Sequence, residues 1–347
     1  MKNLEQKILE ERNNLKTDRL DMSLGEIINM YEEETLIISP EYQRSFRWEK
    51  YQQSRFIESL LLGIPIPAIF VAENSEGKWE LVDGLQRVST ILSFFGKLKN
   101  LEKNNLILEE GDLIGSVLNN VSIENLPLKL KYTLKRSIFR VEILRTDSTF
   151  EMRYELFNRL NTGGTRLEPQ EIRNCIFIGE FNSFLHEMAK NKDFEEIISV
   201  NTQKIEKMFL EELVLRHIAV IYGDLKIKRN LQNYLSCFMK KVANKEIILN
   251  LKNEKEYFIK ITDYLKRNFD SKIFSGGGGA FSENYYDTIF YILRKKFEDY
   301  EDNPELFREH VNQMKEDEKY QEVSGYRNAW ARRLQDKFER ALEIFTR

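Results

Sequence analysis

The stretch AIFVAENSEGKWELVDGLQRVSTILSFF, residues 68–95, decides how the N-terminal half of the chain folds. Two apolar-rich runs, AIFVAE and KWELV, flank the segment 74–77, and this pattern predicts a β-hairpin. The residues after the second run repeat at helical spacing, which predicts a helix over 86–95. The apolar positions of that helix are Val88, Ile91, Leu92 and Phe95. Together these patterns indicate a small sheet with helices packed on it.

Weaker patterns extend this core on both sides. The runs TLIISP (35–40) and SIFRVEIL (137–144) predict strands, and within residues 99–121 the run LILEEGDLIGSVL could hold short strands. Helices are predicted at residues 1–16, at 51–62, directly after Pro127, and where Leu24, Ile27, Ile28 and Tyr31 share one face.

The β signal nearly vanishes after residue 148. Helices are predicted for 149–161, from Pro169 onward, and around 207–222, 230–248, 254–268, 283–300, 304–316 and 326–346. We therefore assign the chain to the α+β class, with a small mixed sheet and flanking helices followed by an all-α helical region. The predicted domains are residues 1–175 and residues 176–347, with the helical domain packed on the first.

Composition limits the classes of function. The chain has 347 residues, 41% of them hydrophobic and 31% charged, which is typical of a soluble globular protein. Its net charge of −3 provides no overall attraction for nucleic acid, so DNA contact requires a local basic patch. Only two cysteines are present, and no run is apolar enough for a signal core or a membrane span. These features predict a cytoplasmic protein without a membrane partner.

A polar corner lies between the second hairpin run and the helix that follows. Asp83 could cap this helix, with Gln86 three residues later completing a capping box. That interpretation leaves Arg87 without a role, because a cation in the first turn opposes the helix dipole. The alternative is an anion at the helix start, where backbone N–H groups and a guanidinium favour phosphate and Gly84 permits close approach.

A second polar segment, SPEYQRSFRW, precedes the helix at 51–62. It places Gln43 and Arg44 between the aromatic residues Tyr42 and Trp48. The segment is either a surface loop anchored by its aromatic side chains or a source of a second arginine for the same anion. An aromatic side chain there could also stack on a base.

A third polar segment, FNRLNTGGTRLEPQE, ends the helix predicted for 149–161. Asn161 and the glycines that begin at Gly163 are either ordinary C-capping residues or the lining of a polar pocket. A further glycine run, SGGGGAFS at 275–282, lacks the Gly-Lys-Ser/Thr of a P-loop and is expected to be only a loop.

The three segments occur in an order that resembles the DUF262 family, the amino-terminal module of GmrS/GmrD-type modification-dependent restriction enzymes. The resemblance covers about residues 20–180 and rests on Pro40–Trp48, Asp83–Arg87 and Phe157–Asn161. Leu85 stands where the family more often has Gln. The family is similar to the ParB/sulfiredoxin superfamily, so the resemblance implies a small sheet of that type.

The resemblance also implies a nucleotide site and a role in bacterial defence against phage DNA. The residues it places at the nucleotide phosphates are Asp83, Gly84, Gln86 and Arg87, bordered by Tyr42, Gln43, Arg44, Trp48, Asn161 and Gly163. The expected cofactors are a nucleoside triphosphate of unspecified base and Mg²⁺, with Asp83 as the candidate metal ligand. Asp83, Gln86 and Arg87 are the candidate catalytic residues, which would orient water and neutralise phosphate charge.

Restriction enzymes of this type also carry a His-Asn-His nuclease domain, and no such domain is predicted here. The three histidines, His186, His217 and His310, are far apart in the sequence and are expected on helix surfaces. For DNA contact, the basic segment LKLKYTLKRSIFR supplies Lys129, Lys131, Lys135 and Arg136.

The favoured function is a DNA-directed protein of phage defence or restriction that binds and hydrolyses a nucleoside triphosphate. One alternative is a non-catalytic, nucleotide-gated module that docks a separate effector, such as a partner nuclease or another defence protein. The other is a metal-dependent DNA nuclease that uses Asp83 with Glu58 or Glu80.

Overall fold

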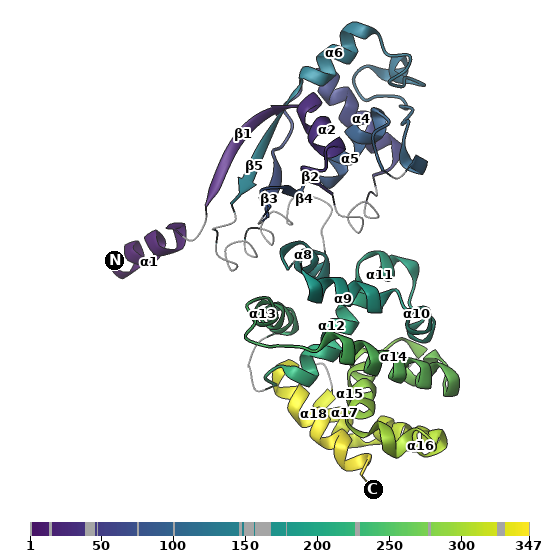
Figure 1. Cartoon of the computed structure of the whole chain (residues 1–347). Helices are drawn as coiled ribbons and strands as arrows, with labels where there is room; N and C mark the ends of the chain where they lie inside the picture. Colours follow the sequence, from purple (N-terminus) through teal and green to yellow (C-terminus); the bar gives the residue numbers. More distant parts are fainter. Residues whose placement is uncertain are drawn as a thin grey trace. The chain divides into compact units, whose positions relative to one another are not determined.

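The computed structural model describes residues 2–13, 16–38, 46, 48–74, 76–99, 101–145, 148, 156, 168–177, 179–225, 230–276, 279–324 and 330–346. The chain forms two compact units, Met1–Arg166 and Leu167–Arg347. The first contains a mixed sheet with helices, and the described part of the second contains helices and short loops (Figure 1). This is the α+β class that the sequence predicts.

The sheet of the first unit has the strand order β1-β5-β3-β4-β2. The outer pair β1/β5 and the hairpin β3/β4 are antiparallel, whereas β3/β5 and β2/β4 are parallel. β4 thus runs opposite to β3 and β5, so β4 ends where β5 begins. The strands are β1 (Thr17–Ser23), β2 (Leu36–Ile37), β3 (Ile69–Glu73), β4 (Trp79–Asp83) and β5 (Ile138–Leu144).

The predicted hairpin is confirmed, and its turn shows why these residues form it. The Asn74 side chain accepts hydrogen bonds from the backbone N–H groups of Glu76 and Lys78, both at 3.0 Å. Gly77 adopts a positive φ of 76°, which glycine does without steric cost. The turn therefore fixes the register of β3 against β4.

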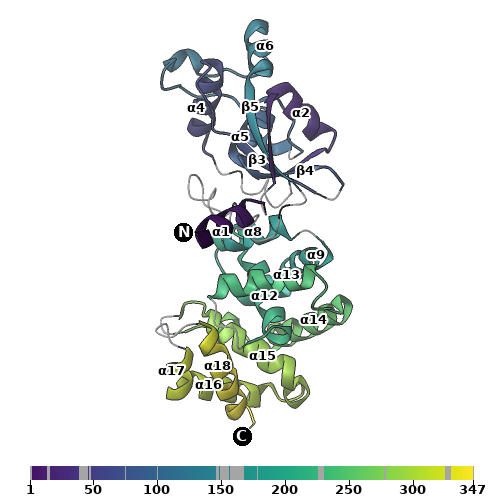
Figure 2. The same ribbon diagram turned by 90° about the vertical axis from the view of Figure 1, so that its left-hand side faces the viewer.

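Helices pack around the sheet and fill the core of the first unit. α5 is buried along most of its length, and α4 packs against both α5 and α6 (Figure 2). Ring contacts join Trp48 to Phe56 of α4, and Phe56 to Phe139 of β5. The described helices of this unit are α1 (Lys2–Asn13), α2 (Leu24–Glu32), α4 (Lys50–Leu61), α5 (Leu85–Phe94) and α6 (Leu128–Arg136), and the described side chains of α1 are exposed.

Two regions differ from the sequence prediction. β1 was not predicted because five of its seven residues are exposed, so it lacks the alternating apolar pattern of a half-buried strand. Pairing with β5 and the ion pairs Arg19–Glu142 and Arg140–Asp21 hold it in place. The short strands considered within 99–121 do not form. The described part of this region has only loops and the 3₁₀ turns η1 (Leu101–Lys103) and η2 (Gly115–Leu118).

In the described residues of the second unit, helices joined by short loops make up the regular structure, with one isolated β-bridge between Ser275 and Phe281. The segment from Pro169 is broken at Phe177 into two helices, and asparagine side chains cap several helix starts. The helices are α8 (Pro169–Ile176), α9 (Glu180–Ala189), α10 (Lys192–Ile198), α11 (Thr202–Glu206), α12 (Phe209–Tyr222), α13 (Leu231–Ala243), α14 (Leu251–Asn268), α15 (Glu283–Tyr300), α16 (Pro304–Glu316), α17 (Glu318–Ser324) and α18 (Trp330–Ile344), with a 3₁₀ turn η3 (Ser271–Phe274).

Charged groups are buried in the core of this unit. Asp287 on α15 accepts hydrogen bonds from Arg216 on α12 and from Lys337 on α18, and all three side chains are nearly inaccessible. Burial alone would raise the pKa of Asp287, but the two cations outweigh it and the pKa is lowered. His217 and His310 are also buried, so their expected place on helix surfaces is wrong.

Asp317, which precedes α17, provides a test of electrostatic stability. Hydrogen bonds from the Arg340 guanidinium, followed by one from the Tyr320 backbone N–H, lower the pKa of Asp317 to about 2. A carboxyl group whose pKa is lower in the folded state than in the unfolded state stabilises the fold at pH values above its unfolded-state pKa. This stabilisation is lost as the pH falls through the folded-state pKa.

Asp317→Asn is therefore expected to lower the free energy of unfolding by about 1–2 kcal/mol at pH 7. The loss should be equal at pH 5 and about half as large at pH 3, as measured by urea unfolding of both proteins. A loss that stays the same from pH 7 to pH 3 would show that the carboxylate charge plays no part.

Candidate functional site

The corner between β4 and α5 depends on one glycine. Gly84 is the N-cap of α5 and adopts the left-handed conformation, with φ 99° and ψ 12°. A Cβ atom at this position would lie 2.5 Å from Cγ2 of Ile69, so no other side chain fits without displacement. The register of β4 also shifts here, because Phe70 pairs with Asp83 but Val71 pairs with Leu81. Such bulges turn the end of a strand and redirect its side chains.

Arg87 holds this corner together. Its Nη2 donates to Oδ2 of Asp83 at 2.7 Å, and its Nη1 donates to the carbonyl oxygens of Pro67 and Ala68, the latter at 3.0 Å. Burial lowers the pKa of Arg87, and the charge of Asp83 opposes this effect. The Arg87 side chain is only 13% exposed, whereas the Asp83 side chain is 42% exposed. Arg87 thus orients the carboxylate of Asp83, and that carboxylate remains accessible to solvent.

The capping box considered for this corner does not form. The N-cap is Gly84 and not Asp83, and no side chain caps α5 in the described part of the chain. Gln86 instead uses its Oε1 to accept a hydrogen bond from the backbone N–H of Trp48, at 3.0 Å. This bond joins the β4–α5 corner to Trp48, at the end of the second polar segment. The two bonded residues are 38 positions apart in the sequence.

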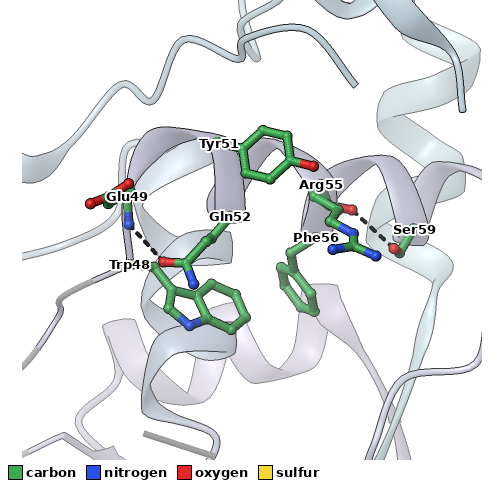
Figure 3. Close-up of a pocket in the computed structure, with 7 residues that line it drawn as sticks. All are labelled: Trp48, Glu49, Tyr51, Gln52, Arg55, Phe56 and Ser59. Carbon is green, nitrogen blue, oxygen red and sulfur yellow. Dashed lines mark hydrogen bonds between the residues drawn. The ribbon is translucent and has the colours of Figure 1, made fainter. Parts of the chain in front are cut away.

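Trp48 also lines a groove that runs along α4. Gln53 donates to the Trp48 carbonyl oxygen at 2.7 Å, and the indole meets the ring of Phe56 edge to face at 5.6 Å. Figure 3 shows the side chains that line this groove of about 700 Å³. They are Trp48, Glu49, Tyr51, Gln52, Arg55, Phe56 and Ser59.

The sequence prediction included only Trp48 among these groove residues. The sequence feature that could have identified the groove residues is their spacing of three or four positions, because this spacing places side chains on one face of a helix. Two of them, Tyr51 and Arg55, are fixed by Asp112: the Tyr51 hydroxyl donates to its Oδ1, and Arg55 Nε lies 2.8 Å from its Oδ2.

Several predicted site residues lie outside the described residues. These are Tyr42, Gln43, Arg44, Asn161 and Gly163. The described residues of the site therefore bring Asp83, Gly84, Gln86, Arg87 and Trp48 together. The convergence of the third polar segment on this corner stays a prediction.

The carboxylates considered for a nuclease have other roles. Glu58 is 2% exposed, and its two oxygens accept hydrogen bonds from the backbone N–H groups of Asp112, Leu113 and Ile114 at 2.7–3.0 Å. Glu80 accepts from the Asn74 side chain in the hairpin. Among the residues that the structure describes, no three His, Cys, Asp or Glu side chains form a group able to hold a metal ion.

Comparison with known proteins agrees with these motifs. Residues 24–178 match the family model described as GmrSD restriction endonuclease, N-terminal domain. These residues make up fewer than half of the chain, and the model is that of the DUF262 family, which the three motifs resemble. Searches of curated proteins and of solved structures each gave no match. In the described part of the chain, no helix has both the length and the apolarity to cross a membrane.

The description of this family names a restriction endonuclease, which supports a role in restriction and defence. This coarse function agrees with the sequence prediction. The β4–α5 corner lies within the matched residues, as do α4 and the basic helix α6.

Proposed function

We propose that this chain is a DNA-directed defence protein whose first unit binds a nucleoside triphosphate at the β4–α5 corner and hydrolyses it. The observation that carries the proposal is the start of α5, which no described side chain caps and which follows a glycine in the left-handed conformation. The first N–H groups of a helix have no partner within the helix, and together with the helix dipole they favour phosphate.

The groups around this helix start support a polyphosphate ligand. Asp83 presents a half-exposed carboxylate beside it, held in one orientation by Arg87. Mg²⁺ in nucleotide sites is commonly held by one or two carboxylates, with phosphates and water as the other ligands, so a single aspartate fits this need. The bound ion would neutralise the phosphate charge, and Arg87 acts mainly by positioning Asp83.

Hydrolysis requires an oriented water molecule. Arg87 holds the carboxylate of Asp83 beside the helix start, and Gln86 lies in the first turn of α5, so we assign these two side chains, Asp83 and Gln86, to orienting that water. Attack on the γ-phosphorus breaks its bond to the bridging oxygen and yields the diphosphate and inorganic phosphate. The groove along α4 includes Trp48, whose backbone N–H donates to Gln86 at the corner, and we assign the nucleoside to this groove.

Calorimetric titration tests the site. Each of the four ribonucleoside triphosphates with Mg²⁺ is titrated into the wild type, into Asp83→Asn and into a control, Asp263→Asn. Asp263 forms the same kind of ion pair, with Arg267 four residues later, in the second unit. We expect at least one nucleotide to bind the wild type and the control with equal affinity and Asp83→Asn about 30-fold or more weakly, a loss of about 2 kcal/mol.

Phosphate release by the same three proteins separates hydrolysis from binding alone. Release by the wild type and the control, but not by Asp83→Asn, is the expected result. Binding without release would replace the enzyme by the nucleotide-gated module. No binding of any nucleotide to the wild type would contradict both.

A further inference from the structure

We propose that α6 and the end of α4 form the surface that binds the sugar-phosphate backbone of duplex DNA. This inference rests on the proposed DNA-directed role, but it does not depend on the nucleotide corner. The surface, which we call the α6 groove, has a volume of about 580 Å³. One wall is the end of α4 at residues 60–63, and the other is the face of α6 that carries Lys129, Tyr132, Thr133 and Arg136.

The charges of α6 are not neutralised within the structure. In the part of the chain that the structure describes, none of Lys129, Lys131, Lys135 and Arg136 forms an ion pair, although Lys131 donates to the carbonyl oxygen of Glu124 at 3.1 Å. Most other described basic side chains of the first unit do have acidic partners. These are Arg19, Arg55, Lys78, Arg87, Lys97, Lys99, Arg140 and Arg145.

The spacing on α6 places two of these four cations, Lys129 and Arg136, on the groove. Lys129, Tyr132, Thr133 and Arg136 lie three or four residues apart, so they share one helical face. No carboxylate occurs among the described residues that line the groove. Tyr132 is 50% exposed, and the Arg136 guanidinium lies 6.0 Å from its ring centroid. A tyrosine and two cations on one accessible face match a phosphate backbone and its sugars.

A phosphate strand fits this surface better than a lipid bilayer does. Exposed apolar side chains are present nearby, including Leu128 at 62% and Ile138 at 65%. A peripheral membrane helix, however, buries a continuous apolar face, whereas the groove face of α6 carries Lys129 and Arg136 on either side of Tyr132 and Thr133. The groove is also concave, so a planar lipid surface cannot enter it, whereas a single sugar-phosphate strand can.

The location of the groove makes it separate from the nucleotide corner. The N-terminal end of α4 lies next to Trp48, whose backbone N–H donates to Gln86 at the corner. The C-terminal end of α4 lines the α6 groove. The groove assigned to the nucleoside runs along the same helix as far as Ser59, but the two grooves share no lining residue, and neither Lys129 nor Arg136 lines the nucleoside groove. A variant of the α6 groove should therefore leave nucleotide binding unchanged.

The test is the binding of a labelled 20-base-pair duplex, measured by fluorescence anisotropy from 50 to 200 mM salt. The variant Lys129→Glu/Arg136→Glu is compared with a control, Lys190→Glu/Lys252→Glu, which changes the net charge equally on exposed residues of the second unit. We expect the α6 variant to bind at least 10-fold more weakly at 100 mM salt, with a salt dependence reduced by about two phosphate contacts. The control should bind within twofold of the wild type.

Two further measurements complete the test. Nucleotide titration of the α6 variant is expected to match the wild type, which distinguishes a failed DNA surface from a failed nucleotide site. Vesicles with 30% phosphatidylserine should not bind the wild type. Equal loss of DNA affinity in the α6 variant and the control would overturn the proposal, as would binding of the wild type to vesicles but not to DNA.

Discussion

Gly84→Ala is expected to lower the free energy of unfolding of the first unit by about 3–5 kcal/mol and to abolish nucleotide binding. The left-handed conformation costs a non-glycine residue about 1–3 kcal/mol. The new Cβ atom would also lie 2.5 Å from Cγ2 of Ile69, on the first residue of β3. Ile69 is fully buried and packs in the sheet, so the corner itself must open to accept the methyl group.

A second glycine separates the cost of the left-handed backbone conformation from the cost of the contact with Ile69. Gly63, which follows α4, has a similar φ of 72°, but a Cβ atom there would meet nothing within 4 Å. Gly63→Ala should therefore lose only about 1–2 kcal/mol. Hydrogen exchange of the buried β4 amides, measured for both variants, gives the stability of this unit directly. Equal losses in the two variants would show that the contact with Ile69 contributes nothing.

Glu58→Ala is expected to lower the stability of the first unit by about 3–5 kcal/mol, the other large effect. The buried carboxylate of Glu58 accepts three backbone hydrogen bonds from residues 112–114, and its removal leaves those N–H groups without this partner and a space in the core. The residues it holds include Asp112, which fixes Tyr51 and Arg55 in the groove along α4. The variant should therefore also disturb that groove.

The matched control is Glu110→Ala, an exposed glutamate beside the same loop, and its stability should change by less than about 0.5 kcal/mol. Urea unfolding of both variants, followed by circular dichroism, gives the comparison. If Glu58 were a metal ligand of a nuclease, its removal would relieve buried charge and leave the stability unchanged or raised. That result would favour the nuclease over the proposed function.

The hairpin and the start of α5 were predictable because their signals are local. Apolar runs, a turn segment and helical spacing all lie within residues 68–95, and the structure confirms each of them. β1 was not predictable because its stability comes from pairing with β5, more than 100 residues away. The absence of strands at 99–121 has a similar cause, since side chains such as Glu58 satisfy the backbone there instead of a neighbouring strand.

The site was predictable in its residues but not in their roles. The local sequence left open whether Asp83 caps α5 or Arg87 helps to bind an anion there, whereas the structure shows Arg87 bound to Asp83 and to carbonyl groups 19 and 20 residues earlier. The role of Gln86 likewise depends on Trp48. Such bonds form only after the loop before β3 and the segment before α4 have packed on the corner, so no local pattern encodes them.

The most direct test of the central claim is hydrogen exchange at the first turn of α5. The amides of Leu85, Gln86 and Arg87 are measured in the wild type with Mg²⁺, with and without a saturating nucleoside triphosphate. If phosphate binds at the β4–α5 corner, these amides should exchange at least 10-fold more slowly with nucleotide, while the amides at the start of α14 in the second unit stay unchanged. Unchanged exchange at Leu85–Arg87 with nucleotide bound, as verified by calorimetry, would contradict the account.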